Sequence, residues 1–455
     1  MLSRVLRALW GDMSSKEIKK FSLLACIITI ILGNYWMLRV MKNPIFHDLV
    51  GMEFQPYAKM TSIIVVAFVI LIYSKLVDVF EKHTLFYLFC SIYAVLFFFL
   101  GFATSHAEMF SLQESSALYP YFTWIPGKFI GWLTYFSFES SSLLIILFWA
   151  FVASVTKAES AKKGYALIVM CIQIGTICGP AVVTNFSPKV GAPVLVAFGG
   201  VLVLIVPFLV KLYMVAVPSE DAEEHNESEV AKKKPKTGFF EGLRLIATNP
   251  YVMGILVVSV VYEIIATILE FQMNMIAKDY FLSRDAFAVF QGKYGMSVNA
   301  ISLIFALLGT SFFMRKFGLR FCLIVYPTVI AIVLFVLLGI NFSGATNPQI
   351  MWALFGSMVA VKGLSYALNN PTKEVMYIPT TKDIRYKAKG WIESFGGRSS
   401  KGIGATITAS FAKNLPALLF VGTVISLGVV GVWLVVANML GKKFNKLQET
   451  NTIVE

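Results

Sequence analysis

Long apolar runs recur along the whole chain, and a shorter polar segment separates each run from the next. A helix of about 20 apolar residues crosses the roughly 30 Å hydrocarbon core of a bilayer. The runs are continuously apolar and do not alternate with polar residues, which favours helices over barrel strands. The pattern therefore predicts an all-α polytopic membrane protein with twelve transmembrane helices. The predicted spans are 21–40, 57–74, 84–104, 129–154, 164–184, 191–213, 252–276, 296–314, 319–341, 350–369, 402–414 and 417–440.

One polar segment divides the predicted spans into two sets of six. Pro218–Gly238 contains acidic and basic blocks and almost no apolar residues, a composition typical of a disordered linker. Two six-helix halves with a long central loop predict a substrate site at mid-membrane between the halves. The predicted parts are a cytoplasmic amphipathic N-terminus (1–20), an N-terminal six-helix bundle (21–214), a charged cytoplasmic linker (215–245), a C-terminal six-helix bundle (246–441) and a cytoplasmic tail (442–455).

Composition supports the membrane assignment and removes several classes of protein. The 455 residues are 57% hydrophobic and only 14% charged, whereas a soluble domain carries roughly 25% charged residues. The five cysteines lie in apolar runs without a CxxC pair, and the four histidines are scattered, so we expect neither a disulfide nor a metal site. The sequence contains no Walker A motif, no dinucleotide-binding motif and no Ser/His/Asp set, which predicts neither enzyme chemistry nor a cofactor.

Basic residues gather in alternate loops. If both termini are cytoplasmic, the inner loops hold most of the lysines and arginines, and the outer loops hold only Lys42, Lys128, Lys189, Lys278, Arg284, Lys293 and Lys413. This asymmetry predicts cytoplasmic termini. It also accounts for most of the net charge of +13 without a nucleic-acid partner. We expect a multi-pass protein of a cell membrane, with a bacterial inner membrane favoured over a parasite's membrane facing its host.

Seven ionisable residues fall inside or at the ends of the predicted spans, where a charge is costly and faces either a cavity or a partner. They are Arg39, Lys59, Glu139, Glu263, Glu270, Lys362 and Lys401. The alternative is that the residues near span ends simply extend to the water at the interface. A cavity with surplus positive charge suits a polyanion, because lysine and arginine bind phosphate oxygens directly. The carboxylates would then hold these cations in the empty cavity or contact a ribose or base.

Three short patterns agree with a carrier, although each is unspecific. The loop SKLVDVFEKH, which contains Asp78, and the loop MRKFGLRF resemble the short charged loops of the major facilitator superfamily. Gly175–Pro180 forms a small-residue face suited to helix packing, and it partly resembles a motif of facilitator antiporters. Gly402 and Gly404 follow Lys401 near a predicted helix start, where free backbone N–H groups would favour an anion.

The most distinctive signal lies in and around Leu368–Gly404, a charge-dense stretch between two apolar runs. Tyr366–Pro379 (YALNNPTKEVMYIP), Lys387–Gly390 (KAKG) and Ser400–Ala405 (SKGIGA) resemble segments of the nucleotide transporters of obligate intracellular bacteria, plastids and microsporidia, typified by the ATP/ADP translocases. Asn34–Asn43 (NYWMLRVMKN) resembles the end of that family's first helix. The resemblance covers nearly the whole chain.

The resemblance implies which charges act on the substrate. Three of the family's four functional charges fall on Lys59, Glu270 and Lys401. The fourth, a glutamate of the fourth span, falls on Ser137 when the segment is matched without a gap, and Glu139 lies two residues further on. The candidate substrate-binding residues are Arg39, Lys59, Glu139, Glu270, Lys362 and Lys401. Charges typical of the family are missing at Asn43, Asn370 and Ser365.

The resemblance also implies a function, namely a membrane nucleotide transporter that exchanges ATP for ADP by alternating access. Two alternatives within transport stay open: a proton-coupled importer of several nucleotides or an NAD carrier, and a facilitator-type carrier of another phosphorylated or anionic metabolite. A non-transporting receptor or assembly factor, in which the buried charges merely pair with one another, is an alternative of another class. The expected partners are ATP and ADP in a lipid bilayer, with other nucleoside triphosphates, NAD and protons as alternatives.

Overall fold

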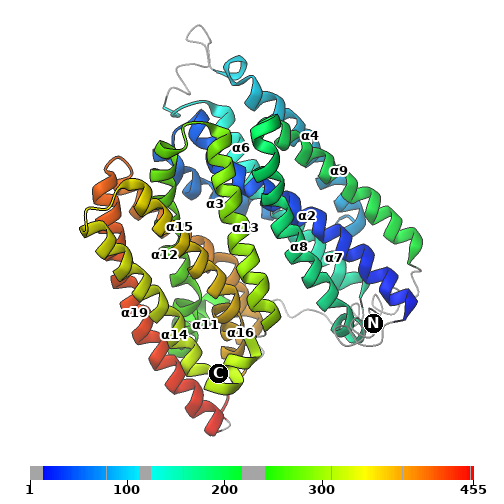
Figure 1. The fold of residues 1–455 in the computed structure, drawn as a ribbon. Coiled ribbons are helices and arrows are strands. Elements are labelled where there is room, and N and C mark those ends of the chain that lie inside the picture. Colours follow the sequence, from blue (N-terminus) through cyan, green and yellow to red (C-terminus); the bar gives the residue numbers. More distant parts are fainter. Residues whose placement is uncertain are drawn as a thin grey trace, which may run out of the picture. The chain divides into compact units, whose positions relative to one another are not determined.

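A computed structural model describes residues 14–77, 79–111, 124–156, 158–217, 241–308, 310–381, 383–450 and 452–454. In this part of the chain nearly every residue is helical, and the one strand-like pairing is an isolated bridge between Thr380 and Val454. The predicted all-α class is therefore confirmed (Figure 1). Residues 1–13, Asp78 and the predicted linker segment Pro218–Gly238 lie outside the described residues.

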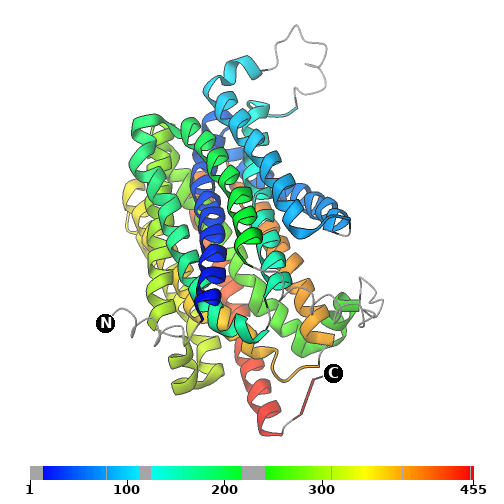
Figure 2. The same ribbon diagram turned by 90° about the vertical axis from the view of Figure 1, so that its right-hand side faces the viewer.

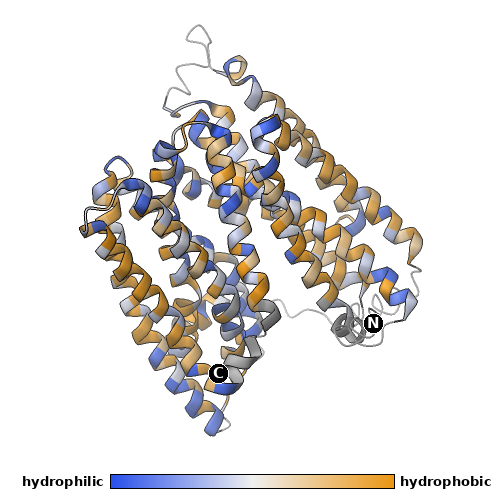
Figure 3. Ribbon diagram, viewed as in Figure 1, coloured by the Kyte–Doolittle hydropathy of each residue, from blue (hydrophilic) through white to orange (hydrophobic). Residues whose placement is uncertain are grey.

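The helices follow the predicted spans in order. Nine segments within the described ranges are long and apolar enough to cross a membrane: Ser15–Leu49, Met52–Val77, Lys82–Ser105, Phe129–Val155, Leu167–Val190, Ala192–Ala216, Pro250–Tyr280, Lys316–Phe342 and Leu415–Glu449. Figure 3 shows apolar residues along most of their length. The predicted spans 296–314, 350–369 and 402–414 correspond to α13 (Arg284–Leu308), α15 (Asn347–Leu364) and α18 (Gly397–Phe411), of which α18 has only 15 residues. These twelve segments form a polytopic bundle protein.

Several helices continue past the apolar run that predicts them. Five basic residues predicted in outer loops lie in helices instead: Lys42, Lys189, Lys278, Arg284 and Lys293. The prediction is wrong for these five because hydropathy marks the part of a helix that lipid can cover, whereas the end of a helix depends on caps and packing. Helix α2 (Ser15–Leu49) is the clearest case, since it runs nine residues beyond the predicted end at residue 40 and contains Pro44.

Contacts divide the described residues into two compact units. Unit 1 contains the described parts of Met1–Gly51, Ile64–Lys234 and Leu282–Met296, and unit 2 contains those of Met52–Ile63, Pro235–Phe281 and Ser297–Glu455. Two helices therefore start in one unit and continue in the other. Helix α3 (Gln55–Val77) starts in unit 2, and helix α13 starts in unit 1.

Helix α2 is the centre of unit 1. It packs along α8 (Ala158–Val190), α9 (Ala192–Ala216) and α6 (Phe129–Ser140), and α4 (Lys82–Ser105) packs along α9 and α7 (Leu143–Val155). Figure 2 shows α2, in blue, beside α8 and α9, in green. Their inward-facing apolar side chains form one continuous buried core.

Glycines allow α2 and α8 to approach closely. A Cβ atom on Gly179 would lie 2.1 Å from the carbonyl oxygen of Gly33, and one on Gly175 would lie 2.6 Å from that of Thr29. Small residues at such contacts let the backbones of two membrane helices meet. The small-residue face predicted at Gly175–Pro180 therefore serves helix packing within unit 1.

Helix α12 (Pro250–Tyr280) is the centre of unit 2. It packs against α15, α18 and α19 (Leu415–Glu449), and α14 (Thr310–Phe342) packs against α15 and α19. The Asn249 side chain caps its first turn by accepting from the backbone of Tyr251, and Pro250 occupies the first helical position, where its missing N–H costs nothing.

The polar stretch between α15 and α18 is helical almost throughout. It consists of short α- and π-helical turns: η3 (Ser365–Asn369), α16 (Asn370–Met376), η4 (Ile384–Ala388), α17 (Lys389–Trp391) and η5 (Ile392–Gly396). Helix α11 (Glu241–Thr248) packs on η4 and α17.

Ion pairs stabilise this stretch and attach α11 to it. The Lys387 Nζ atom lies 2.9 Å from the Glu241 carboxylate, and the Lys389 Nζ atom lies 2.7 Å from that of Glu374. The hydrogen bond to Glu241 raises the pKa of Lys387, because it favours the charged amine. Nearby carboxylates therefore balance the positive charges of Lys387 and Lys389, and these lysines have a structural role.

Candidate functional site

The six predicted substrate-binding residues lie in both units. Arg39 on α2 and Glu139 on α6 belong to unit 1. Unit 2 holds the other four: Lys59 at the start of α3, Glu270 on α12, Lys362 on α15 and Lys401 on α18. Lys59 joins this group because Met52–Ile63 belongs to unit 2 although the rest of α3 does not.

In unit 1 the charged partner of Glu139 is Lys42. The Lys42 Nζ atom forms an ion pair with the Glu139 carboxylate and lies 4.4 Å from the centroid of the Tyr135 ring. Lys42 is only 9% exposed, so its amine is removed from most of the water that would solvate it. A carboxylate and an aromatic face replace that water. The pair also explains why α2 can remain helical and buried beyond its apolar run.

A break in the fourth span positions the Glu139 carboxylate. Helix α6 ends at Ser140 and α7 starts at Leu143. The hydroxyl of Ser142 donates to the carbonyl of Glu139 at 2.8 Å, and that of Ser140 donates to the carbonyl of Ser137 at 3.0 Å. These carbonyls also accept from the backbone N–H of Ser141, so the serine hydroxyls add a second hydrogen bond at each and reinforce the end of α6. The charge of Glu139 therefore sits at the end of α6, in the middle of the fourth span.

The two candidates for the family's acidic position have different surroundings. Ser137 is 5% exposed, and its hydroxyl donates to the carbonyl of Leu133 in its own helix at 2.6 Å. Glu139 carries the charge that pairs with Lys42. Of these two residues, Glu139 is therefore the one whose side chain takes part in an ion pair.

Arg39 lies one turn before Lys42 on α2 and is placed by aromatic residues. Its guanidinium carbon is 4.9 Å from the centroid of the Trp36 ring, and its Nη1 atom donates to the hydroxyl of Tyr35 at 3.1 Å. The face of an aromatic ring attracts a cation, and more strongly where water is scarce. Two cations therefore occupy neighbouring turns of α2.

In unit 2 helix α12 presents a polar stripe to three lysines. Ser259, Glu263 and Glu270 recur at a spacing that places them on one face of the helix. The Lys362 Nζ atom lies 3.0 Å from the Glu270 carboxylate, and the Lys401 Nζ atom lies 3.7 Å from that of Glu263. A third lysine, Lys373 on α16, donates to the carbonyl of Ser259 at 2.8 Å.

The two ion pairs of the stripe differ in burial. The side chains of Lys362 and Glu270 are 14% and 21% exposed, whereas those of Lys401 and Glu263 are 42% and 31% exposed. A close and mostly buried pair is costly to break, while a longer and exposed pair contributes little. Lys362 is therefore held firmly by its carboxylate, and Lys401 is the more accessible cation.

The prediction that Lys401 lies beside a free helix start is wrong. The chain is helical without interruption over residues 383–411, so the backbone N–H groups of Gly402 and Gly404 lie inside a helix and not at its end. Gly404 has a packing role, because a Cβ atom there would lie 2.8 Å from the Cβ of Thr267 on α12. The close approach of α18 to α12 brings Lys401 to the polar stripe.

Two lysines, Lys42 and Lys373, lie beside the charged residues described above but are absent from the six predicted substrate-binding residues. Lys42 follows Arg39 by three residues and so shares its helix face, a signal that the sequence does contain. Lys373 belongs to the YALNNPTKEVMYIP segment, but it lies beyond the apolar run that ends at residue 369. In both cases the end of the apolar run was taken as the end of the buried helix.

Comparison with known proteins gives relatives over nearly the full length. The chain matches the TLC ATP/ADP transporter family over residues 2–444. ADP,ATP carrier protein 1 of Rickettsia typhi is 26% identical, with 99% of this chain and 98% of the relative covered. ADP,ATP carrier protein 1 of Chlamydia pneumoniae is 25% identical, with coverages of 96% and 94%. The chloroplastic ADP,ATP carrier protein 2 of Arabidopsis thaliana is 26% identical, with coverages of 94% and 75%.

Solved transporter structures share the fold. The D-xylose-proton symporter has a TM-score of 0.59 at 15% identity, with 93% of this chain and 97% of that chain covered. The nucleoside transporter NupG has a TM-score of 0.58 at 14% identity, with coverages of 93% and 99%. At such identities the likeness establishes the fold alone, which is major-facilitator-like. The family match extends over nearly all of this fold, and the chain therefore belongs to the TLC ATP/ADP transporter family.

Proposed function

We propose that this chain is a membrane nucleotide transporter that exchanges ATP for ADP by alternating access. The observation that carries the proposal is the family match over residues 2–444. Two relatives covered over almost their whole length are named ADP,ATP carrier proteins, and the fold is shared with other carriers. The chain is accordingly a carrier and not an enzyme.

Cations in each unit are the proposed contacts of the nucleotide phosphates. These are Arg39 and Lys42 in unit 1 and Lys59, Lys362 and Lys401 in unit 2. Hydrogen bonds from lysine or arginine to phosphate oxygens are among the strongest in proteins because both partners are charged. A nucleotide diphosphate or triphosphate supplies several negative charges, which suits a site with more cations than carboxylates.

Carboxylates hold two of these cations while no nucleotide is bound. Glu139 pairs with Lys42, and Glu270 pairs with Lys362. Leaving one member of a buried pair alone costs about 3–5 kcal/mol, so a phosphate that takes the lysine must bind it strongly enough to offset the cost of the carboxylate that loses its partner. Nucleotide binding is then an exchange of one anion for another, which favours phosphorylated substrates over neutral nucleosides.

A second candidate is the transport of another phosphorylated or anionic metabolite. The observation that favours it is Asn43, which stands where the resembling family has aspartate and directly follows Lys42. Asn43 is 5% exposed, and its Oδ1 atom is buried without a hydrogen-bond partner in the described residues. A neutral amide in place of a carboxylate changes the charge around Lys42, and with it the number of substrate charges that fit.

The orientation rests on charge placement. We place both termini in the cytoplasm, in a bacterial inner membrane, because lysine and arginine gather in the loops on one side. The two six-helix halves at 21–214 and 246–441 and the linker at 215–245 are retained as predictions.

Uptake of radiolabelled ATP into cells expressing this chain tests the proposal. We expect external ADP to release the label and a proton uncoupler to have no effect. Replacing Lys59 and Lys401 by glutamine should abolish uptake, while the same change at the exposed Lys443 should not. Competition by many nucleotides together with loss of uptake in the uncoupler would indicate a proton-coupled importer. If no nucleotide enters or competes, nucleotide transport is the wrong function.

A further inference from the structure

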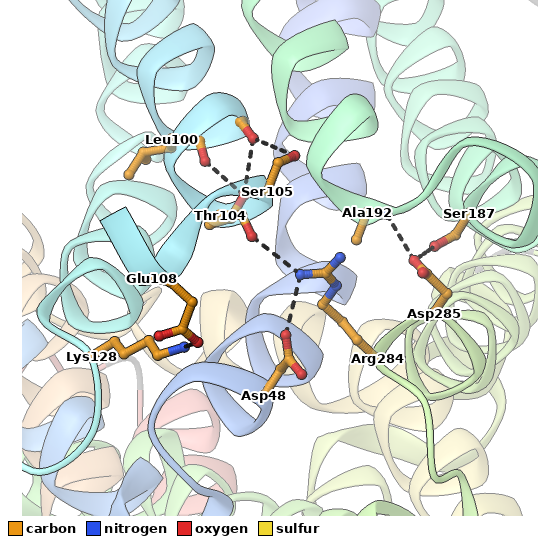
Figure 4. Close-up of polar contacts among 11 residues, drawn as sticks. Asp48, Leu100, Thr104, Ser105, Glu108, Lys128, Ser187, Ala192, Arg284 and Asp285 are labelled. Carbon is orange, nitrogen blue, oxygen red and sulfur yellow. Dashed lines mark hydrogen bonds and ion pairs between the residues drawn. The ribbon is translucent and has the colours of Figure 1, made fainter. Parts of the chain in front are cut away.

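The first turns of α13 are anchored in unit 1. Leu282–Met296 belongs to that unit, whereas the rest of the helix belongs to unit 2. Phe287 and Ala288 are buried, and Ala288 is part of the unit 1 core. Two charged residues, Arg284 and Asp285, begin the helix and make the polar contacts of this anchor (Figure 4).

Asp285 caps a helix to which it does not belong. Its Oδ1 atom accepts from the backbone N–H of Ala192 and from the hydroxyl of Ser187, each at 2.7 Å. Ala192 is the first residue of α9, and the residue before it, Gly191, has no side chain with which to cap the helix. A carboxylate at a helix start satisfies a free N–H and interacts favourably with the helix dipole. The start of α9 therefore depends on α13 for its cap.

Arg284 reaches two other helix ends. Its Nη1 atom lies 3.2 Å from the Asp48 carboxylate, in the last turns of α2, and 3.4 Å from the carbonyl of Thr104, in the last turn of α4. The side chains of Arg284 and Asp48 are 21% and 43% exposed. Two adjacent residues thus connect α13 to the ends of α2, α4 and α8 and to the start of α9, as Figure 4 shows.

Glycines about two and three turns further along hold α13 close to α8. A Cβ atom on Gly292 would lie 2.4 Å from the Oγ1 atom of Thr184 and 3.0 Å from the carbonyl of Pro180. One on Gly295 would lie 2.9 Å from the side chain of Val40 on α2. The glycines make this face of α13 fit unit 1, and the charged pair fixes its position along the axis.

We infer that Arg284 and Asp285, with their partners Asp48, Thr104, Ser187 and Ala192, form a releasable latch that positions α13 and opens once in each transport cycle. The inference rests on the proposed alternating-access function. Such transport moves the two parts of a carrier relative to each other. Because α13 is one continuous helix through Met296 and Ser297, this movement must either bend the helix there or free residues 282–296 from unit 1.

Release is favoured by the chemistry of the contacts. The ion pair of Arg284 and Asp48 is partly exposed, so water can replace each partner at little cost. The cap of α9 is better protected, because Ser187, which shares the Asp285 carboxylate, is 1% exposed. Water can replace this cap once α13 has moved away, because helix starts are commonly solvated. A permanent contact would instead bury both charged side chains. On the proposed orientation, these helix ends lie on the outer side of the membrane, so the latch would control access from outside.

Reversible crosslinking tests whether the latch must open. The variant Ser187→Cys/Asp285→Cys places two thiols side by side, because the side chains of these residues are now joined by a hydrogen bond of 2.7 Å. After oxidation with copper phenanthroline, and confirmation of the disulfide by peptide mass spectrometry, we expect ATP/ADP exchange in proteoliposomes to be lost. Reduction should restore it in the same sample. Oxidation of Ser187→Cys alone or Asp285→Cys alone, each of which keeps the five native cysteines, should leave the ATP/ADP exchange rate of that variant unchanged. Full exchange by the crosslinked protein would overturn the inference and show that α13 bends instead.

Hydrogen exchange tests the latch independently of transport. In Asp285→Ala the backbone amides at the start of α9 should exchange hydrogen about fivefold to thirtyfold faster, the change expected from loss of a helix cap. Lys293→Gln, on the same helix but without a part in the latch, is the control. Unchanged hydrogen exchange in Asp285→Ala would overturn the capping role. If the wild-type protein moves no nucleotide while the amides respond as expected, the proposed function fails and the contact itself stands.

Discussion

The ion pair of Lys362 and Glu270 leads to a prediction with opposite signs for its two members. Their charged atoms are 3.0 Å apart, and the side chains are 14% and 21% exposed. At this distance the Coulomb attraction is about 5 kcal/mol for an effective dielectric constant of about 20. If a phosphate replaces Glu270 on Lys362 when the nucleotide binds, the carboxylate competes with the substrate, whereas the lysine is its ligand.

The two neutralising substitutions should therefore change the Kd for ATP in opposite directions. Glu270→Gln removes the competitor and should tighten ATP binding by about tenfold, equivalent to about 1.4 kcal/mol of the attraction that the phosphate must otherwise replace. Exchange should slow, because nucleotide release then returns Lys362 to a site without the Glu270 carboxylate. Lys362→Gln removes a charged hydrogen-bond donor and should weaken binding by about 1.5–3 kcal/mol, roughly tenfold to hundredfold.

Isothermal titration calorimetry of the protein in nanodiscs measures both Kd values, and proteoliposomes give the exchange rate. Glu374→Gln is a matched control, because it removes the carboxylate 2.7 Å from Lys389 in the polar stretch outside the spans. The control should change the Kd by less than about fivefold, since exposed pairs contribute at most about 1 kcal/mol. If Glu270→Gln weakens ATP binding as Lys362→Gln does, the pair is a static structural contact and the reasoning is refuted.

Three further predictions concern the other charged groups and the packing of unit 1. Glu139→Gln should strongly reduce ATP/ADP exchange while Ser137→Ala should not, because Glu139 carries the charge that pairs with Lys42; the reverse result in an exchange assay would return the family's acidic position to Ser137. Lys401→Gln should weaken ATP binding at least tenfold, because Lys401 is a proposed phosphate contact. Glu263→Gln should change ATP binding by less than about fivefold, because its ion pair with Lys401 is exposed. Equal effects of the two variants in calorimetry would contradict the proposed role of Lys401. Gly179→Ala should destabilise the protein by about 1–3 kcal/mol through overpacking, since its Cβ would lie 2.1 Å from the Gly33 carbonyl oxygen. Gly428→Ala, with nothing within 4 Å of the added Cβ, should not. Equal thermal unfolding of the two variants would show that α2 and α8 are not in close contact.

The apolar pattern was sufficient to place the helices. The run at 191–213 predicts α9, which spans Ala192–Ala216, and the run at 84–104 predicts α4, which spans Lys82–Ser105. Lipid requires a long apolar surface on every spanning helix, so hydropathy reports the presence of a span reliably. Intramembrane charges were equally visible, because a lysine such as Lys362 stands out in an apolar run.

The pattern could not show which groups meet. Hydropathy describes how polar the surroundings of a residue are on average, and it contains nothing about the identity of a partner. Lys42 seemed to belong to a loop because its partner, Glu139, lies 97 residues further along the chain. The start of α13 was likewise taken for loop, since the groups that hold Asp285 are 93 and 98 residues away. The resemblance added the substrate class and three of the charged positions, which no pattern of apolar residues contains.

Counter-exchange in proteoliposomes tests the central claim most directly. Purified protein is reconstituted into liposomes loaded either with ADP or with buffer alone, and entry of radiolabelled ATP is followed with and without a proton uncoupler. We expect rapid entry only into ADP-loaded liposomes, with one ADP leaving for each ATP that enters and no effect of the uncoupler. Equal entry into both kinds of liposome, or no entry into either, would contradict the claim that this chain exchanges ATP for ADP.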